Sequence, residues 1–343
     1  MNMSECLSQD IIIKDCNFIL RDAPANWLLL QNSNIFLTGG TGFLGKWFLH
    51  SFIHINETLH LDSTMTVLSR SPEKFLKENP FFADKNCIQF VQGDVRDFPC
   101  TRGGYNYLIH AAAPVSAAEN DNETYSVIVE GTKHVLNFAK QAGVKKILLT
   151  SSGAVYGKQP PELSHIPETY RPQPATAYGT GKLAAERLCL ECAIDTSIAR
   201  CFAFVGPYLP LDIHYAIGNF ILDAMNGNTI TIKGDGRPYR SYLYTADLMC
   251  WLWTILLNGN ADEAYNVGSE DAMSISELAK IVSECCPPSV KCEILGKPDF
   301  NVPAPRYVPN TEKAQKELGL KQKYPLPDSI KRTVQWAHQS LIQ

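Results

Sequence analysis

The sequence lacks the features of several large classes of protein. None of its apolar runs is long enough to cross a bilayer, including the longest at residues 249–257. The N-terminus is polar and has no basic segment followed by an apolar one, as a signal peptide would. The net charge of −4 provides no positive field for nucleic acid. We therefore expect a cytoplasmic protein that binds neither membranes nor nucleic acids.

Metal-binding patterns are also missing. The 11 cysteines are an odd number scattered through the chain, which favours reduced, buried thiols over a disulfide framework. Cys189 and Cys192 form a Cys-x-x-Cys, but no second ligand pair with zinc spacing accompanies them. We expect both as small core residues on one helix. No HExxH motif and no internal repeat occurs, so nothing in the sequence predicts a metal site.

What is present begins with the length. A chain of 343 residues exceeds the size at which one core usually stops growing, so two lobes are expected. Residues 1–33 carry no readable motif, but their apolar runs at 10–13 and 27–30 indicate an extension that packs on the body of the first lobe.

A strand, a glycine-rich turn and a helix follow one another near residue 40. Residues 35–37 are a short apolar run of strand type, and residues 47–53 have the apolar pattern of a helix. Glycines between them allow a tight turn and a close approach of backbone to a pyrophosphate, which the helix N-terminus favours. We expect this turn to bind a dinucleotide through Gly39, Thr41, Gly42, Phe43, Leu44 and Gly45.

The end of the next strand indicates which dinucleotide binds. An NAD-binding protein typically places a carboxylate there for the ribose 2′-hydroxyl. This chain has Ser69 and Arg70 instead, whose donors suit a 2′-phosphate. The sequence therefore favours NADP(H), with NAD(H) possible.

Further along, strands continue to alternate with helices, which predicts a parallel sheet covered on both faces. Asp94, with Val95 beside it, follows the third strand and is positioned to accept from the adenine amino group. The next strand ends in Ala111, Ala112 and Ala113, small residues that let the cofactor's ribose lie close.

Tyr178 and Lys182 lie four residues apart, so on a helix they share one face. A neighbouring cation favours the ionised phenol, and we expect Lys182 to lower the pKa of Tyr178 and tune it as a general acid or base. Ser152 ends an earlier strand, so its hydroxyl should face the ligand crevice at the carboxyl edge of the sheet.

The glycine loop, Ser152, Tyr178 and Lys182 together resemble the extended short-chain dehydrogenase/reductase family, in its NAD(P)-dependent nucleotide-sugar epimerase/dehydratase branch. The resemblance covers roughly residues 34–340. It implies a Rossmann-type α/β domain over residues 34–205, with a doubly wound parallel sheet. A smaller substrate-binding α/β lobe would occupy mainly residues 206–343, interleaved with the first. By resemblance, Ser152 hydrogen-bonds the reacting sugar oxygen, Tyr178 moves its proton, and Lys182 also holds the nicotinamide ribose.

The resemblance also implies a nucleotide-diphosphosugar substrate. The segment around residues 230–236 is similar to the strand that lies along the nucleotide base, and Arg240 and Arg306 are similar to a pair of diphosphate-binding arginines. A homodimer that pairs through the Tyr178 helix is a further expectation from the family. The substrate-binding residues expected on this basis are Ser152, Asn219, Lys233, Arg240 and Arg306.

One departure from the family narrows the reaction. Its 4,6-dehydratases carry one or two carboxylates directly after the serine or threonine, where this chain has Gly153 and Ala154. Dehydration and the related decarboxylation are therefore disfavoured, because no second proton-transfer group is available. A 4-ketoreductase using NADPH and a 4-epimerase using tightly bound NAD remain, and Arg70 favours the reductase. A non-catalytic dinucleotide-binding regulator is disfavoured because Ser152, Tyr178 and Lys182 are all present.

Overall fold

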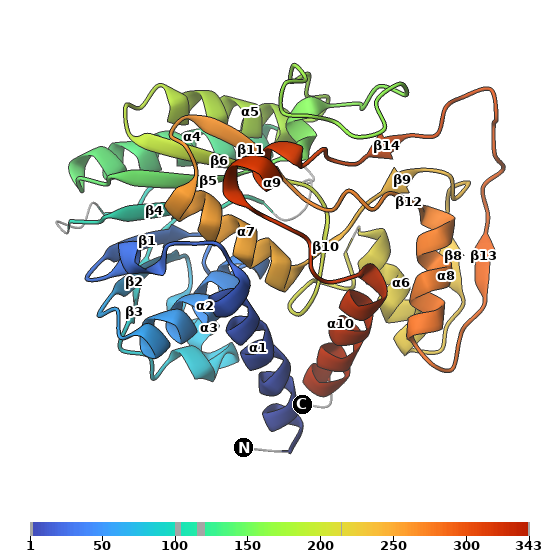
Figure 1. Cartoon of the computed structure of the whole chain (residues 1–343), viewed down its shortest axis with the longest axis horizontal. Coiled ribbons are helices and arrows are strands. Elements are labelled where there is room, and N and C mark those ends of the chain that lie inside the picture. The colour runs from blue at the N-terminus through green and yellow to red at the C-terminus, as the bar shows by residue number, and fades with distance from the viewer. Residues whose placement is uncertain (1–2, 100–103, 115–120, 214, 342–343) are drawn as a thin grey trace.

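The structure is a computed structural model that describes residues 3–99, 104–114, 121–213 and 215–341, with the backbone alone for residues 3–9 and 340–341. In this part of the chain a seven-stranded, wholly parallel sheet lies at the centre, in the order β11-β6-β5-β4-β1-β2-β3 (Figure 1). Its strands are β1 (Asn34–Thr38), β2 (Thr64–Ser69), β3 (Ile88–Gln92), β4 (Tyr107–His110), β5 (Lys146–Ser152), β6 (Asp195–Cys201) and β11 (Glu263–Val267).

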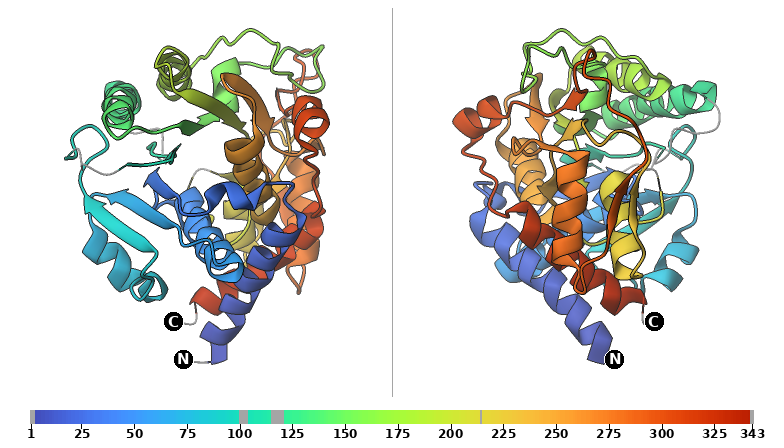
Figure 2. Two further views of the ribbon diagram at one scale, coloured as in Figure 1. Left: turned by 60° about the vertical axis from the view of Figure 1, so that its left-hand side comes forward. Right: turned by 90° about the vertical axis from the view of Figure 1, so that its right-hand side faces the viewer.

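Helices cover both faces of this sheet (Figure 2). Ile35 and Leu37 of β1 belong to the apolar core of one face, whereas Phe36 between them belongs to the core of the other. The first face carries α1 (Met3–Asp22), α2 (Phe43–Leu59), α3 (Pro72–Glu78) and α7 (Thr245–Asn258), and the second carries α4 (Asp121–Gln141) and α5 (Ala177–Leu190). The predicted fold class, a Rossmann-type doubly wound sheet, is confirmed.

A second, smaller layer of elements follows the sheet in sequence. The elements are β7 (Phe204–Val205), α6 (Ala216–Met225), β8 (Ile230–Ile232), β9 (Tyr239–Arg240), β10 (Leu243–Tyr244), β12 (Met273–Ser274), α8 (Ile275–Cys285), β13 (Cys292–Ile294), β14 (Arg306–Tyr307), α9 (Glu312–Leu318) and α10 (Leu326–Leu341). The apolar core of this layer gathers buried side chains of three helices, α6, α8 and α10, and of two short strands, β7 and β8. Within the same stretch of sequence, β11 joins the central sheet and α7 packs in the core of its first face.

Three of these short strands, β12, β9 and β14, form a small sheet of their own. Strand β14 runs parallel to β9, with Arg306 opposite Tyr239 and Tyr307 opposite Arg240. This pairing brings a segment from the end of the chain to the carboxyl edge of the central sheet.

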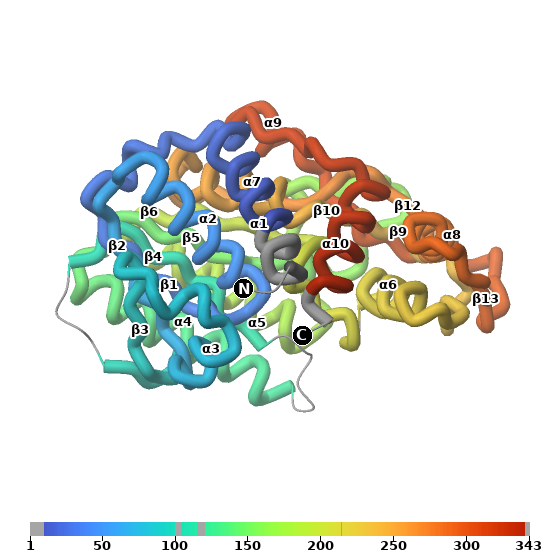
Figure 3. Tube along the Cα trace, turned by 90° about the horizontal axis from the view of Figure 1, so that it is seen from below, coloured from blue at the N-terminus to red at the C-terminus, as the bar shows by residue number. Residues whose placement is uncertain are grey.

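The N-terminal segment packs on the first face of the sheet. Helix α1 lies against α2, α7 and α10 (Figure 3), with Ile12, Cys16 and Ile19 buried in the core there. The 3-10 helix η1 (Trp27–Leu30) adds the buried Trp27 and Leu30. Among the described helices, none combines the length and apolar character that a bilayer crossing requires.

Two helix ends can be described from their local structure. Ser274 and Glu277 form a complete capping box at the start of α8, with Glu277 N–H donating to the serine hydroxyl at 3.2 Å. The placement of Cys189 and Cys192 on one helix is wrong in part, because α5 ends at Leu190 and Cys192 lies beyond it, although both thiols are buried.

The sheet order reverses between β1 and β4, from β1-β2-β3 on one side to β4-β5-β6 on the other. A crevice for ligands forms at such a reversal, outside the carboxyl ends of the strands. Thr38, His110 and Ser152 are the last residues of β1, β4 and β5. The candidate site is therefore built around them.

Candidate active site

The glycine loop after β1 lies directly against the end of β4. Gly39 has a φ of 72°, and a Cβ there would lie 2.6 Å from the carbonyl carbon of Ala111 and 2.7 Å from the nitrogen of Ala112. A Cβ on Gly45 would lie 2.3 Å from the Cα of Gly40. A side chain at either position would push the loop off the strands, which explains why these two positions are glycine.

Helix α2 begins at Phe43 with Gly42 as its N-cap, and Gly42 provides no side chain to cap the helix. The first N–H groups of a helix have no partner within it, so those of Phe43, Leu44 and Gly45 are directed at the crevice as donors for an anion. Thr41 is half-buried in the turn before them. The loop therefore fits the pyrophosphate of a dinucleotide.

A buried histidine supports the small residues beside the loop. His110 lies between Thr38 Oγ1, 2.8 Å from Nδ1, and Thr132 Oγ1, 3.0 Å from Nε2. Since the Thr132 hydroxyl donates to the Ile128 carbonyl, Nε2–H of His110 must be the donor to Thr132, and Nδ1 accepts from Thr38. The Thr38 oxygen in turn accepts from the Ala112 N–H at 3.2 Å.

Burial lowers the pKa of His110 to about 3, so the ring is neutral and holds the Thr38 hydroxyl that accepts from the Ala112 N–H. The sequence shows His110 at a strand end, but nothing in its local pattern indicates this role.

The end of β2 presents the groups expected for the cofactor's adenosine. Ser69 is buried and its hydroxyl accepts from the Ser71 N–H at 3.2 Å, whereas Arg70 is exposed. Asp94 lies nearby, and its carboxylate already accepts from the backbone N–H and the Nε of Arg96, each at 3.0 Å. The hydrogen bond from the Arg96 side chain holds the pKa of Asp94 below its usual value. Val95 packs on Gly131 of α4.

Ser152, Tyr178 and Lys182 converge at the carboxyl end of β5. Thr176 caps α5 by accepting from the Gly179 N–H at 3.1 Å, which sets Tyr178 in the first turn. Ser152 is close enough to the Tyr178 hydroxyl to oppose the rise in the pKa of Tyr178. The buried Lys182 ammonium donates to the Thr150 carbonyl at 2.8 Å and lies 5.8 Å from the centroid of the Tyr178 ring.

The two glycines between Tyr178 and Lys182 allow α5 to approach its neighbours. A Cβ on Gly179 would lie 2.6 Å from the Ala154 carbonyl oxygen, and one on Gly181 would lie 3.2 Å from Ile128 of α4. These close contacts bring Tyr178 to the strand end and bury Lys182.

The expected lowering of the pKa of Tyr178 by Lys182 is wrong. Burial raises the pKa of Tyr178 above its ordinary value, and Ser152 is the neighbour that opposes the rise. Burial also lowers the pKa of Lys182 to about 8. The Lys182 ammonium donates to the Thr150 carbonyl, and its charge is not among the main influences on the pKa of Tyr178. Tyr178 is therefore a protonated acid at neutral pH.

A buried ion pair lies behind these residues. Glu186, one turn after Lys182 on α5, accepts from Arg200 of β6 at 2.8 and 3.1 Å and from the Ser151 hydroxyl at 2.5 Å. It therefore ties α5 to β5 and β6 next to the three site residues. Glu186 lies four residues after Lys182, so the two share one helical face. This spacing is the feature from which the sequence could have predicted Glu186 next to the site.

The predicted substrate-binding residues are placed differently from one another. Arg240 and Tyr307 share one face of the small sheet, with the guanidinium carbon 5.8 Å from the tyrosine ring centroid. Arg306 lies on the opposite face, 4.1 Å from the ring centroid of Tyr239. The predicted pair of arginines is thus on neighbouring strands, but the register does not aim them at one point.

Asn219 and Lys233 do not join the site in this structure. The Asn219 amide, in its hydrogen-bonded orientation, donates to the carbonyls of Leu211 and Ile213 at 3.0 and 2.7 Å, so it braces that loop. Lys233 is exposed at the end of β8.

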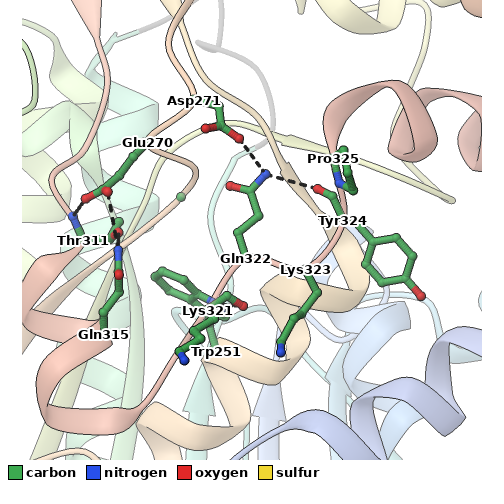
Figure 4. A pocket seen from close by; sticks show the side chains of 11 residues that line it. Trp251, Glu270, Asp271, Thr311, Gln315, Lys321, Gln322, Lys323, Tyr324 and Pro325 are labelled. Atoms are coloured by element: carbon green, nitrogen blue, oxygen red, sulfur yellow. Dashed lines mark hydrogen bonds between the residues drawn. The ribbon is translucent and has the colours of Figure 1, made fainter.

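A cavity of about 450 Å³ lies elsewhere, between α7, α9 and the segment before α10 (Figure 4). Its polar groups largely satisfy each other, with Gln322 donating to Asp271 at 3.2 Å and Gln315 to Glu270 at 3.4 Å. It includes none of the residues predicted for cofactor or catalysis. In the described part of the chain, no group of three or more His, Cys, Asp or Glu side chains could hold a metal ion.

A parallel doubly wound sheet, a glycine loop that fits a pyrophosphate and a Tyr-x-x-x-Lys helix beside Ser152 define a dinucleotide-binding enzyme of the short-chain dehydrogenase/reductase class. The particular family is established by sequence. The chain belongs to the NAD dependent epimerase/dehydratase family, whose sequence model matches residues 35–268. This confirms the resemblance drawn from the motifs.

Relatives of several activities are similar to the chain. UDP-glucuronic acid decarboxylase 3 of Arabidopsis thaliana is 29% identical over 312 residues, covering 87% of each protein. Among solved structures, a UDP-glucose 4-epimerase of Thermotoga maritima with UDP-glucose has a TM-score of 0.75 at 22% identity, covering 90% of this chain and 99% of its own. A dTDP-glucose 4,6-dehydratase of Streptomyces venezuelae with NAD has a TM-score of 0.76 at 24% identity, covering 89% and 97%. These two structures show the shared fold.

Proposed function

We propose that this enzyme reduces the 4-keto group of a nucleotide-diphospho-4-keto-6-deoxyhexose with NADPH, as a step of deoxysugar biosynthesis. The cofactor, when bound, supplies the hydride that goes to the carbonyl carbon. Tyr178 donates its proton to the carbonyl oxygen, so that the ketone becomes an alcohol and NADPH becomes NADP⁺. Ser152 hydrogen-bonds the same oxygen, and Lys182 holds the nicotinamide ribose.

One observation carries this choice of reaction. The two positions after Ser152 are Gly153 and Ala154, and the space above Gly153 is filled by the Phe202 ring and the Tyr307 hydroxyl. Elimination of water or loss of a carboxylate calls for a further acid or base beside the sugar. A carboxylate at position 153 would have no room here. Tyr178 serves reduction or oxidation at one carbon, which needs a single proton transfer.

The substrate class follows from the family and from Arg240. The relatives' names specify UDP-glucuronic acid, UDP-glucose and dTDP-glucose, which are all nucleotide diphosphosugars. We assign the diphosphate to Arg240, because its guanidinium carbon lies 5.8 Å from the ring centroid of Tyr307, whose hydroxyl lies beside Gly153. Arg306, Lys233 and Asn219 remain predictions for this role, as does the homodimer.

A 4-epimerase with tightly bound NAD is the second candidate, because it uses the same three residues. Arg70 favours the reductase, since a 2′-phosphate marks the exchanging cofactor NADPH and no carboxylate occupies that strand end. A regulator without turnover is disfavoured by the assembled Ser152, Tyr178 and Lys182.

Incubation with NADPH and a panel of dTDP-, CDP- and GDP-4-keto-6-deoxyhexoses tests the proposal. We expect loss of NADPH absorbance in equal amount to the sugar reduced, and a fall of about 10²- to 10⁴-fold in kcat for Tyr178→Phe, with NADPH binding kept. UDP-glucose and UDP-glucuronic acid are included as controls. Interconversion of UDP-sugars without net NADPH consumption, or release of CO₂ from UDP-glucuronic acid, would overturn the assignment.

A further inference from the structure

Two opposite charges of α5 are anchored on neighbouring residues of β5. The Lys182 ammonium donates to the carbonyl of Thr150 at 2.8 Å, and the Glu186 carboxylate accepts from the hydroxyl of Ser151 at 2.5 Å. The two side chains share one face of the helix, four residues apart, and the residues are 3% and 2% exposed. Because solvent screens buried charges little, each of these two groups acts on the other.

The Glu186 carboxylate is held from its other side by Arg200 of β6. The guanidinium donates to the two carboxylate oxygens at 3.1 and 2.8 Å, and it reaches on to the Tyr156 hydroxyl at 3.0 Å. The hydrogen-bond acceptor of Lys182, by contrast, is a neutral carbonyl. Glu186 therefore serves two buried cations, of which one is bound directly and the other starts one helical turn away.

The other titratable groups around the Lys182 ammonium are uncharged at neutral pH. Apart from the ion pair of Glu186 and Arg200, those on β4, β6 and α5 are His110, Cys201, Cys189 and Tyr178. Burial lowers the pKa of the histidine to about 3 and raises the pKa of each thiol and of the phenol. Helix α4 presents the apolar Ile128 to Gly181. Among the described neighbours, Glu186 therefore supplies the negative charge that acts on Lys182.

We propose that Glu186 is a positioning residue whose buried negative charge keeps Lys182 protonated and in place to hold the nicotinamide ribose. Since Glu186 is almost fully buried, it acts through the lysine and not on the cofactor itself. Burial lowers the pKa of Lys182 to about 8, and the charge of Glu186 opposes that fall. This inference rests on the part of the proposed function that gives Lys182 the ribose.

Glu186→Gln tests the charge, because glutamine keeps the length of the side chain and an oxygen that accepts from Ser151. We expect the pH at which half of the affinity for NADPH is lost to fall from about 8 to about 7. The Kd should then match that of wild type within about twofold at pH 6 and be about fivefold higher at pH 8. Fluorescence titration from pH 6 to pH 9 measures both. An equal weakening at every pH would show a merely structural role and would overturn the proposal.

Glu186→Asp is the complementary variant, since it keeps the charge and shortens the side chain. It should unfold at a lower urea concentration than wild type, because the contacts with Arg200 and Ser151 are weakened. The pH of half-maximal affinity should nevertheless stay at about 8. A fall to about 7 in this variant would mean that the shape of the side chain matters and not its charge, which contradicts the proposal.

Glu168→Gln is the matched control. It makes the same chemical change in the same polar layer, where the Glu168 carboxylate accepts from the Asn266 N–H at 2.7 Å and its backbone carbonyl accepts from Arg200 at 3.5 Å. Its side chain does not belong to the helical face of Lys182, so the Kd at pH 8 should stay within about twofold of wild type. A change as large as that of Glu186→Gln would show that the effect is not specific to Glu186.

A second variant covers the case in which Glu186→Gln does not fold, because it leaves the buried Arg200 without its partner. Glu186→Gln combined with Arg200→Gln removes both charges of the pair. The carboxylate reaches back to the strand that holds the ammonium, whereas the guanidinium extends to Tyr156, so Lys182 lies nearer to the negative charge. The pH of half-maximal affinity should therefore still lie below that of wild type, and a value equal to or above it would overturn the proposal.

The wild-type titration separates this inference from the proposed function. Constant wild-type affinity between pH 7 and pH 9 would show that Lys182 does not hold the ribose by its charge. A fall in wild-type affinity that Glu186→Gln reproduces at the same pH would show that only the role of Glu186 is wrong. Absence of NADPH consumption with every sugar would instead sink the reductase assignment and leave the binding test as it stands.

Discussion

At the scale of single residues, burial moves the proton equilibria of Lys182 and Tyr178 in opposite directions. Burial penalises the charged form of each group, so the pKa of the ammonium falls to about 8 and that of the phenol rises. Tyr178 is thus kept as an acid, ready to protonate an alkoxide. Lys182 is still mostly protonated at pH 7, but it loses its charge as the pH rises through about 8. That charge is what would hold the ribose.

This gives NADPH binding a predictable pH dependence. If the ribose hydroxyls accept from the protonated Lys182, affinity is fully present below pH 8 and is lost as pH rises through that value. We expect the Kd for NADPH to rise about tenfold between pH 7 and pH 9, since about a tenth of the lysine stays protonated at pH 9. Fluorescence titration measures it. Lys182→Arg keeps its charge throughout this range and should lose the slope, whereas an equal slope in both proteins would contradict the assignment.

Arg70 is the residue on which the choice of cofactor depends. It is exposed at the end of β2, where its guanidinium can bind the 2′-phosphate by charge-assisted hydrogen bonds. We expect the wild-type enzyme to bind NADPH more tightly than NADH. Arg70→Ala should weaken NADPH binding, so that the ratio of the Kd for NADH to the Kd for NADPH falls about tenfold.

The matched control for Arg70 is Lys74→Ala, which removes an exposed cation of α3 paired with Glu78 at 3.8 Å. Its effect on the ratio should be less than about twofold. Tighter binding of NADH by the wild-type enzyme would contradict the interpretation of this strand end.

Local motifs identify the residues of the site, but they do not predict how those residues interact. Ser152, Tyr178 and Lys182 could be identified because each lies in a short pattern whose strand or helix is evident from the sequence. The approach of the Tyr307 hydroxyl to Gly153 depends on the pairing of β14 with β9, which nothing near Tyr307 in the sequence specifies. The pKa direction of Tyr178 was missed for a similar reason, because burial is a property of the packed molecule.

At the scale of elements, the parallel strands and their helices were predictable because each reads as an apolar run bounded by turn residues. The small sheet was not predictable, because β9, β12 and β14 are each two residues long, too short to show a repeating pattern of apolar residues. Its register decides that Arg240 lies beside Tyr307 and that Arg306 lies beside Tyr239, so the binding of one diphosphate by both arginines stays a prediction.

At the scale of the whole molecule, α1 joins two parts of the chain that are far apart in sequence. It packs on α2, which follows the glycine loop, and on α10 at the end of the chain (Figure 3). The centre of this contact is polar. Asp15 is fully buried, accepts from the Tyr244 hydroxyl at 2.6 Å and pairs with Arg332 of α10, whose Nε donates to Tyr244 at 3.0 Å.

Removal of Asp15 should therefore destabilise the protein without disturbing the cofactor site. Burial raises the pKa of Asp15 to about 6 in spite of Arg332, so the carboxylate is ionised at pH 7.5. Asp15→Ala leaves the half-buried Arg332 and the Tyr244 hydroxyl without their partner. We expect a loss of about 2–3 kcal/mol in the free energy of unfolding, less than for a fully buried pair because Arg332 remains partly solvated. Urea denaturation at pH 7.5 measures it.

Lys14→Ala on the same helix is the control for this change. It removes a solvent-exposed pair with Asp10, whose side chains are 62% and 46% exposed, and should cost less than about 0.5 kcal/mol. The Kd for NADPH should stay within about twofold of wild type in both variants, because the side-chain partners of Asp15 in the described part of the chain are Tyr244 and Arg332 and not residues of the glycine loop. Equal stability losses in the two variants would show that the buried cluster does not hold α1 to the rest of the molecule.

Asp15→Asn keeps an acceptor for Tyr244 but removes the charge. Its free energy of unfolding should lie between those of wild type and Asp15→Ala if the ion pair and the hydrogen bond both contribute.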